Sequence, residues 1–248
     1  MTRVLLLWVV VAAVPVAHPA AGGDPAGEVA VRAAERKIEA GPLVEPVRDA
    51  ERRGLPARLV ADKVLEGLAK GVPPDRVAAV AAALVGRLAE ADVLLRRVEA
   101  RGPAPAADRG AALADLAQVF AAGVTPAAVD GLMAGGPAKA DAVVAAATAV
   151  AALARRGVPA AESLGLGRAL VARPTSAPEV GAAFDAWRAA GGREPREFLA
   201  DAERRVSEGR SLAGPDGGEP PGRGARDAGR DERSRMGGEA GRPHGRRP

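Results

Sequence analysis

The fold is decided by four short joints in the sequence: Gly54-Leu55-Pro56, Gly71-Val72-Pro73, Gly123-Val124-Thr125-Pro126 and Gly157-Val158-Pro159. In each joint a proline follows a glycine within three residues. Glycine is favoured just after the C-terminus of a helix because it adopts the left-handed conformation without strain. Proline is favoured in the first turn of a helix, where its missing N–H needs no partner. Each joint therefore predicts the end of one helix and the start of the next.

The same punctuation continues on both sides of these joints, through residues 24–209. It predicts helices over residues 25–40, 45–53, 56–70, 74–101, 108–122, 126–134, 138–156, 159–172, 176–190 and 195–208. Strands are not indicated, because the chain has one Ile, no Tyr and no sustained alternation of apolar and polar residues. We expect an all-α protein, either an antiparallel helical bundle or a short α-solenoid-like array of helix-Gly-Val-Pro-helix joints.

The joints form a weak internal repeat. Their glycines are 17, 52 and 34 residues apart, close to multiples of 17. A helix pair of 34 residues is the period of tetratricopeptide solenoids, but the aromatic and small residues that define that family are missing here. Two interpretations stay open: a duplicated helix pair, or the ordinary form of a helix–Gly–Val–Pro–helix joint.

Apolar residues at helical spacing predict the buried faces. In the long helix 74–101 the seam positions are separated by three and four residues, as in a coiled coil. They are Val77, Ala81, Leu84, Leu88, Ala91, Leu95 and Val98. Because Ala contributes much of the apolar content and buries little area, we expect a thin, extended core.

The two ends of the chain differ from this helical region, 23–209. Arg3 precedes an apolar run, Val4–Val16, that is shorter than the roughly 20 residues needed to span a bilayer. Small residues follow, so residues 1–22 are predicted to be a cleaved signal peptide. The alternatives are an uncleaved anchor and a buried helix.

Residues 210–248 are rich in Gly, Pro and Arg, and we expect a disordered tail there. Its last seven residues, 242–248, are purely basic and are expected to touch anionic lipid or polymer weakly. An internal boundary is expected near residues 102–107, where Gly and Pro interrupt the helices.

Composition excludes several kinds of chemistry. The chain has no Cys, and its two histidines, His18 and His244, lie near its ends, so thiolate metal sites and the usual Ser-His or Cys-His pairs are unavailable. The net charge of +4 is spread along the chain, which argues against a nucleic-acid footprint. We therefore predict no enzyme activity, no catalytic or metal-binding residues and no cofactor.

Two further patterns resemble sites but have simpler explanations. Asp62 and Glu66, like Glu35 and Glu39, are four residues apart, yet bases at helical spacing make each pair part of an ion-pair ladder. The Gly-x-Gly of residues 163–168 lacks the preceding strand and the third glycine of a dinucleotide site.

The aromatic residues Phe184, Trp187 and Phe198 are the candidate partner-binding site. Their helical spacing also fits a core contact, and an exposed Trp187 would be the leading contact residue.

Three classes of function remain after these exclusions. The first is an exported, periplasmic or secreted, non-catalytic interaction or scaffold protein of the bacterial cell envelope, with a protein as its partner. The second is a structural protein anchored in the membrane by an uncleaved N-terminal segment. The third is a hydrolase that works through carboxylates alone, which would need two facing acids, one with a raised pKa.

Overall fold

The structure is a computed structural model of the chain, and it describes residues 23–212. The predicted signal peptide, residues 1–22, lies outside the described residues, and so does the predicted tail from residue 213 onward. The first residues of that predicted tail are packed on the fold. Leu212 is buried, and the Ser211 hydroxyl donates a hydrogen bond to Glu179 at 3.2 Å.

Residues 23–212 are all-helical and contain no strand, which confirms the predicted fold class. Within this range there are ten α-helices and one short 3-10 helix. They are α1 (Pro25–Glu35), α2 (Gly41–Arg52), α3 (Ala57–Ala69), α4 (Pro74–Arg101), α5 (Arg109–Ala121), α6 (Pro126–Leu132), η1 (Met133–Gly135), α7 (Ala140–Ala154), α8 (Leu164–Ala172), α9 (Ala177–Ala189) and α10 (Pro195–Ser207).

Most of the helices begin as the sequence indicates. Proline occupies the first turn of α1, α2, α4, α6, α9 and α10. The side chains of Asp108, Thr125 and Ser176 accept hydrogen bonds from the backbone N–H three residues further on, at 2.9, 3.2 and 3.3 Å. Each of these caps satisfies a backbone donor that the helix leaves without an internal partner.

The odd-numbered helices all end in the same way. They are followed by a residue with a left-handed backbone: Lys37, Gly71, Gly123, Gly157 and Gly191, with φ of 57°, 69°, 86°, 86° and 96°. The next residue donates its N–H to the carbonyl five positions earlier, at 2.9 to 3.3 Å, which satisfies the end of the helix. Three of the four intervals between these residues are 34 positions, and the fourth is 52.

The predicted repeat therefore has a structural counterpart, although its members differ from those expected. Gly54 has a left-handed backbone too, but it ends α2, a helix of the even-numbered set. Lys37 and Gly191 take part in its place.

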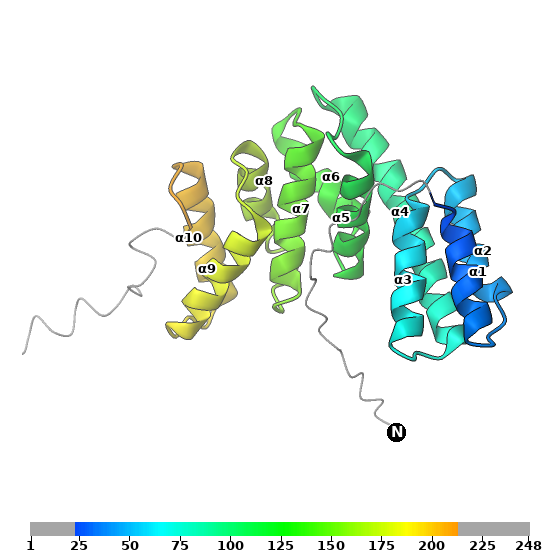
Figure 1. Cartoon of the computed structure of the whole chain (residues 1–248). Helices are drawn as coiled ribbons and strands as arrows, with labels where there is room; N and C mark the ends of the chain where they lie inside the picture. The colour runs from blue at the N-terminus through cyan, green and yellow to red at the C-terminus, as the bar shows by residue number, and fades with distance from the viewer. Residues whose placement is uncertain (1–22, 213–248) are drawn as a thin grey trace, which may run out of the picture.

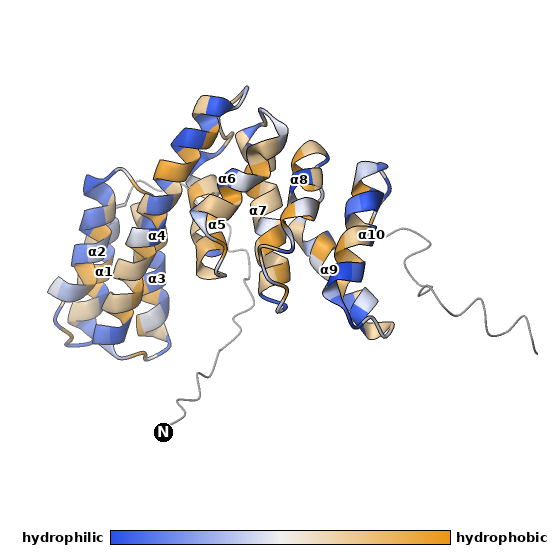
Figure 2. Ribbon diagram, turned by 180° about the vertical axis from the view of Figure 1, so that it is seen from behind, coloured by the Kyte–Doolittle hydropathy of each residue, from blue (hydrophilic) through white to orange (hydrophobic). Residues whose placement is uncertain are grey.

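Burial follows the same spacing. Eleven residues before each left-handed position lies a buried side chain or methyl group: Ala26, Val60, Ala112, Ala146 and Val180. In α4 the predicted seam is buried except for Leu84, which is half-buried, and Val85 and Leu94 are buried beside it. Figure 2 shows the apolar stripes of the helices turned toward their neighbours.

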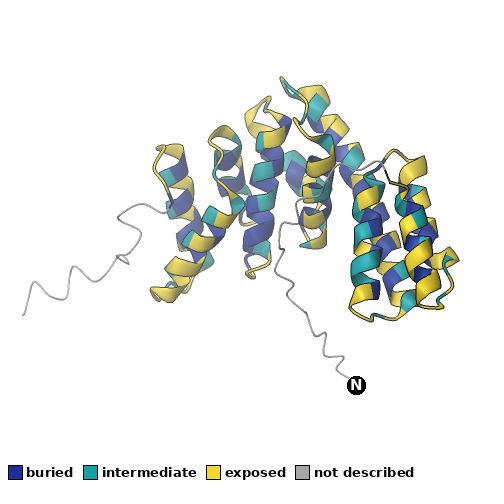
Figure 3. Cartoon of the chain, in the orientation of Figure 1, coloured by how far each residue is buried: buried dark blue, intermediate teal, exposed yellow. Residues whose placement is uncertain are grey.

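The helices stack in two layers and form a curved row (Figure 1). In one layer α1 packs on α3, α5 on α7 and α7 on α9; in the other α2 packs on α4, α4 on α6, α6 on α8 and α8 on α10. The central helix α7 contacts five others, and ten of its 15 residues are buried (Figure 3). This is the predicted solenoid-like array, and its first four helices pack as a bundle.

Three helix boundaries differ from the sequence prediction. The first helix ends at Glu35 instead of residue 40, because Lys37 adopts the left-handed conformation and the chain turns there. The next helix starts at Gly41 instead of residue 45. The helix expected from Pro159 starts only at Leu164, after turns in which Glu162 and Ser163 donate to the carbonyls three residues earlier.

Candidate functional site

The predicted aromatic site is a compact cluster at the last helix pair. Phe184 and Trp187 lie on α9 and Phe198 lies on α10. The Phe184 and Phe198 rings meet edge-on with centroids 5.1 Å apart, and Trp187 is 5.6 Å from Phe184 and 5.8 Å from Phe198. Phe184 and Phe198 are buried, whereas Trp187 is half-buried. Of the three rings, only the indole is partly exposed.

Gly192 makes room for the Trp187 side chain, which the sequence analysis did not foresee. A Cβ atom built on Gly192 would overlap the indole ring. The same two positions of the preceding odd helices hold Leu153 with Val158 and Val119 with Val124, all of them buried. In the last repeat a large residue faces a glycine, so the two changes compensate in volume. The signal in the sequence is Gly191-Gly192, where the joints after α3, α5 and α7 have Gly-Val.

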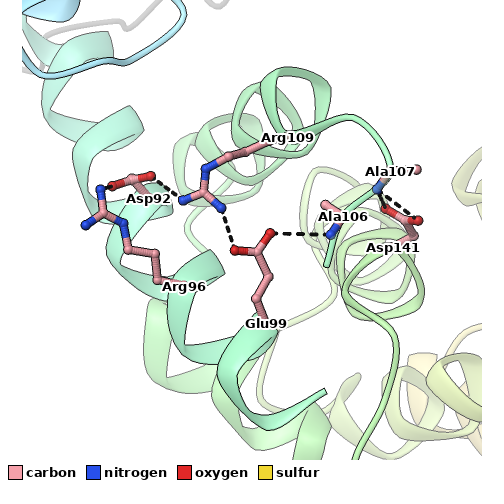
Figure 4. Close-up of polar contacts among 7 residues, drawn as sticks. All are labelled: Asp92, Arg96, Glu99, Ala106, Ala107, Arg109 and Asp141. Atoms are coloured by element: carbon pink, nitrogen blue, oxygen red, sulfur yellow. Dashed lines mark hydrogen bonds and ion pairs between the residues drawn. The ribbon is translucent and has the colours of Figure 1, made fainter. Parts of the chain in front are cut away.

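A polar network fixes the connection between α4 and α5 (Figure 4). The Arg109 guanidinium contacts Asp92 at 2.6 Å and Glu99 at 2.5 Å, and Arg96 pairs with Asp92 at 2.6 Å. Glu99 also accepts from the backbone N–H of Ala106 at 3.3 Å. Charges of opposite sign thus balance within the network.

The same connection is tied to α7. The Asp141 carboxylate accepts from the N–H of Ala107 at 3.2 Å, and a Cβ on Gly102 would overlap the Ala138 carbonyl. Residues 102–107, where an internal boundary was expected, are therefore held on both sides by the fold. The network has a structural role, and nothing in its sequence spacing pointed to it, because Arg109 reaches 10 and 17 residues back across a helix hairpin.

The predicted ion-pair ladder at Asp62 and Glu66 is present, and the one at Glu35 and Glu39 is present only in part. Arg58 pairs with Asp62 at 2.9 Å, and Glu66 accepts from Lys63 at 2.8 Å and from Lys70 at 2.5 Å. The hydrogen bonds from the two lysines lower the pKa of Glu66 below its usual value. Arg32 pairs with Glu35 at 2.9 Å, but Glu39 lies beyond the end of α1, so it is not part of that ladder.

The Gly-x-Gly stretch packs helices together. A Cβ on Gly167 would lie 2.6 Å from a Leu132 methyl group, and Gly165 lies against Glu203. Ser163, just before α8, is fully buried and donates to the Pro159 carbonyl at 3.4 Å. These glycines permit close helix approach, and they begin a helix without a preceding strand.

Asp115 on α5 is a further residue that sequence reasoning missed. Partial desolvation by neighbouring atoms raises the pKa of its carboxyl, although the residue as a whole is exposed. The sequence of this amphipathic helix does not distinguish Asp115 from an ordinary solvent-facing acid.

Two features are absent from residues 23–212. No group of three or more His, Cys, Asp or Glu side chains in this range is placed to hold a metal ion. No single helix there has the length and apolar composition to span a membrane, although α5 and the α6–η1 segment would pass together as a pair bent by 117°.

Comparisons with known proteins give no relative. No protein-family model, curated protein or solved structure matches this chain. Its function must be inferred from its own sequence and geometry.

Proposed function

We propose that the chain is an exported, non-catalytic helical interaction protein of the bacterial cell envelope, and that it binds a partner protein. The observation that carries the proposal is the stacking of short helical hairpins in two layers through residues 23–212. Arrays of this kind contact only their neighbours within the chain and present long surfaces to other proteins.

The ionisable side chains support this proposal because many of them hold neighbouring repeats together. Such pairs include Arg58–Glu28 at 2.7 Å, Arg156–Asp185 at 2.8 Å, Arg97–Asp130 at 2.9 Å and Arg196–Glu162 at 3.2 Å. The paired residues are 29 to 34 positions apart, about one repeat. The hydrogen bond from Arg156 lowers the pKa of Asp185 below its usual value. Acids used in this way are poor candidates for general acid–base catalysis.

The partner contact is proposed at the α9–α10 end of the array. Trp187 combines an exposed edge with a rigid setting, because Phe184, Phe198 and Gly192 fix its ring. Tryptophan in such a setting is typical of residues that dominate protein interfaces. The exposed Arg188 follows Trp187 and the exposed Arg193 follows Gly192, and both add positive charge near the indole.

The test is affinity capture from envelope extract with residues 23–248 as bait. The matched variant is Trp187→Leu with Gly192→Val, which recreates the Leu153–Val158 pair of the preceding repeat and so removes the indole while keeping the packing. We expect a stoichiometric partner on the wild-type bait and its loss on the double variant. Val93→Ala, a change at an exposed residue of α4, is the control and should keep the partner.

Other outcomes would redirect the proposal. If the double variant captured the partner as well as the wild-type bait does, Trp187 would not be the contact residue. A partner held by residues 23–248 but not by 23–212 would place it in the tail. If no bait captured a partner, the hypothesis of a carboxylate-only hydrolase would be tested next, starting with Asp115→Asn.

Export is a separate part of the proposal and rests on the sequence of residues 1–22. Cell fractionation and the mass of the mature chain test it. A mature chain that starts near residue 23 in the periplasm or medium supports export. A full-length chain in the membrane fraction supports the anchored structural protein.

A further inference from the structure

We infer that α4 carries a hinge at Gly86, about which two lobes of the protein change their relative angle. The first lobe is α1–α3 with the first half of α4, and the second lobe is α5–α10 with the second half of α4. This inference does not depend on the proposed function.

The contacts of α4 divide between the lobes. Helix α4 has 28 residues, whereas α3 and α5 have 13 each, and both pack on α4 through short connections. The first half meets α3, where Gly67 lies against Val77. The second half meets α5 and α6 through Arg109–Asp92 and Arg97–Asp130. Since each hairpin folds back along α4, α3 and α5 lie one after the other along it.

This arrangement interrupts the odd-numbered layer. In the described region α1 stacks on α3, α5 on α7 and α7 on α9, whereas α3 does not stack on α5 in this way. The interval of 52 residues between Gly71 and Gly123 marks the same interruption. Figure 1 shows α1–α3 offset from the row that starts at α5, with α4 running between them.

The exposed polar side chains of α5 are of the kind expected on the last helix of a stack. Asp115 and Gln118 are exposed on α5, whereas the equivalent positions of α7, Ala149 and Ala152, are buried. In α7, which has a neighbour on each side in the row, these positions are buried alanines. In α5 polar groups stand at the same positions, as expected for a terminal face in contact with water.

Gly86 lies near the middle of α4 and is the one glycine in that helix. It is exposed, and a Cβ added there would meet no atom within 4 Å. Exposed Ala82 and Ala83 lie one turn before it, so no large side chain covers Gly86 from that turn. Glycine weakens a helix by its backbone freedom, and the packing between α1–α3 and α5–α10 runs mainly through α4.

The experiment uses the whole chain, which has no native Cys. Spin labels on Arg48→Cys and Ala200→Cys measure distances between the lobes, and labels on Ala127→Cys and Ala200→Cys measure distances within the second lobe; all three positions are exposed. We expect the distance distribution between lobes to be about twofold broader than the one within a lobe. Gly86→Ala should narrow the distance distribution between the lobes and leave the distribution within the second lobe unchanged.

The control is Gly131→Ala on α6, where an added Cβ also meets no atom within 4 Å; it should narrow neither distribution. Hydrogen exchange on the unlabelled chain gives a second reading, in which amides 86–90 exchange faster than amides 93–97 and slow down in Gly86→Ala. Equal widths between and within lobes, or uniform protection along α4, would overturn the inference.

Discussion

Replacing Lys37 by glycine should stabilise this protein, contrary to the usual effect of glycine. Lys37 is the one residue other than glycine with a positive φ among residues 23–212. It occupies the position that Gly71, Gly123, Gly157 and Gly191 occupy after the other odd helices. Its side chain is exposed, so the substitution removes no buried contact.

The magnitude follows from two opposing terms. The left-handed conformation costs a residue with a Cβ about 1–2 kcal/mol. Removing that strain stabilises the folded chain, but glycine offsets about 0.5–1 kcal/mol of the stabilisation because it has more freedom in the unfolded chain. The net gain is therefore about 0.5–1 kcal/mol, which corresponds to a two- to fivefold change in an equilibrium constant, roughly.

The assay combines urea unfolding, followed by far-UV circular dichroism, with hydrogen exchange. The amide of Ile38 is the local reporter, because it donates to the Ala33 carbonyl at 2.9 Å and closes the end of α1. Its exchange should slow by about two- to fivefold in Lys37→Gly. The control is Lys70→Gly, at a φ of −79°, where glycine should only destabilise. If Lys37→Gly were neutral or destabilising while α1 stayed helical, strain at this residue would be refuted.

Four further substitutions at single positions are checked by urea unfolding. Gly157→Ala should lower the free energy of unfolding by about 1–2 kcal/mol, because φ is 86° at that position. Gly131→Ala, inside α6, should raise it by about 0.5–1 kcal/mol. Asp115 has a raised pKa, so its charged form opposes folding: Asp115→Asn should stabilise the protein at neutral pH, and the gain should vanish in acid, once the aspartate itself is protonated. Glu66 has a lowered pKa, so its charge supports folding: Glu66→Gln should destabilise at neutral pH, and the difference should disappear as the pH falls through the pKa of the folded state.

Local chemistry was enough to predict most of the helices. The Gly–Pro joints placed the ends of α3, α5 and α7 within one or two residues, because proline and glycine act on the backbone where they stand. The same reasoning failed at Lys37, since the preference of lysine for a helix gives no sign of a left-handed turn. It also placed the start of α8 too early, because a proline permits a helix without requiring one.

The candidate site was predicted only in part. The spacing of Phe184 and Trp187 showed that they share a face of one helix, and Phe198 was expected to pack near them. That Gly192 receives the indole, and that only Trp187 keeps an exposed edge, depends on how α9 and α10 meet.

The sequence by itself determined the helical class, the exclusion of thiol chemistry and the ion-pair ladders within single helices. These properties depend on residues within one or two turns of each other. The tertiary structure alone decided the pairing of Arg109 with Asp92 and Glu99, the polar terminal face of α5 and the division of the array along α4. They arise from contacts between helices, and a helix sequence records which face is apolar without recording which neighbour covers it.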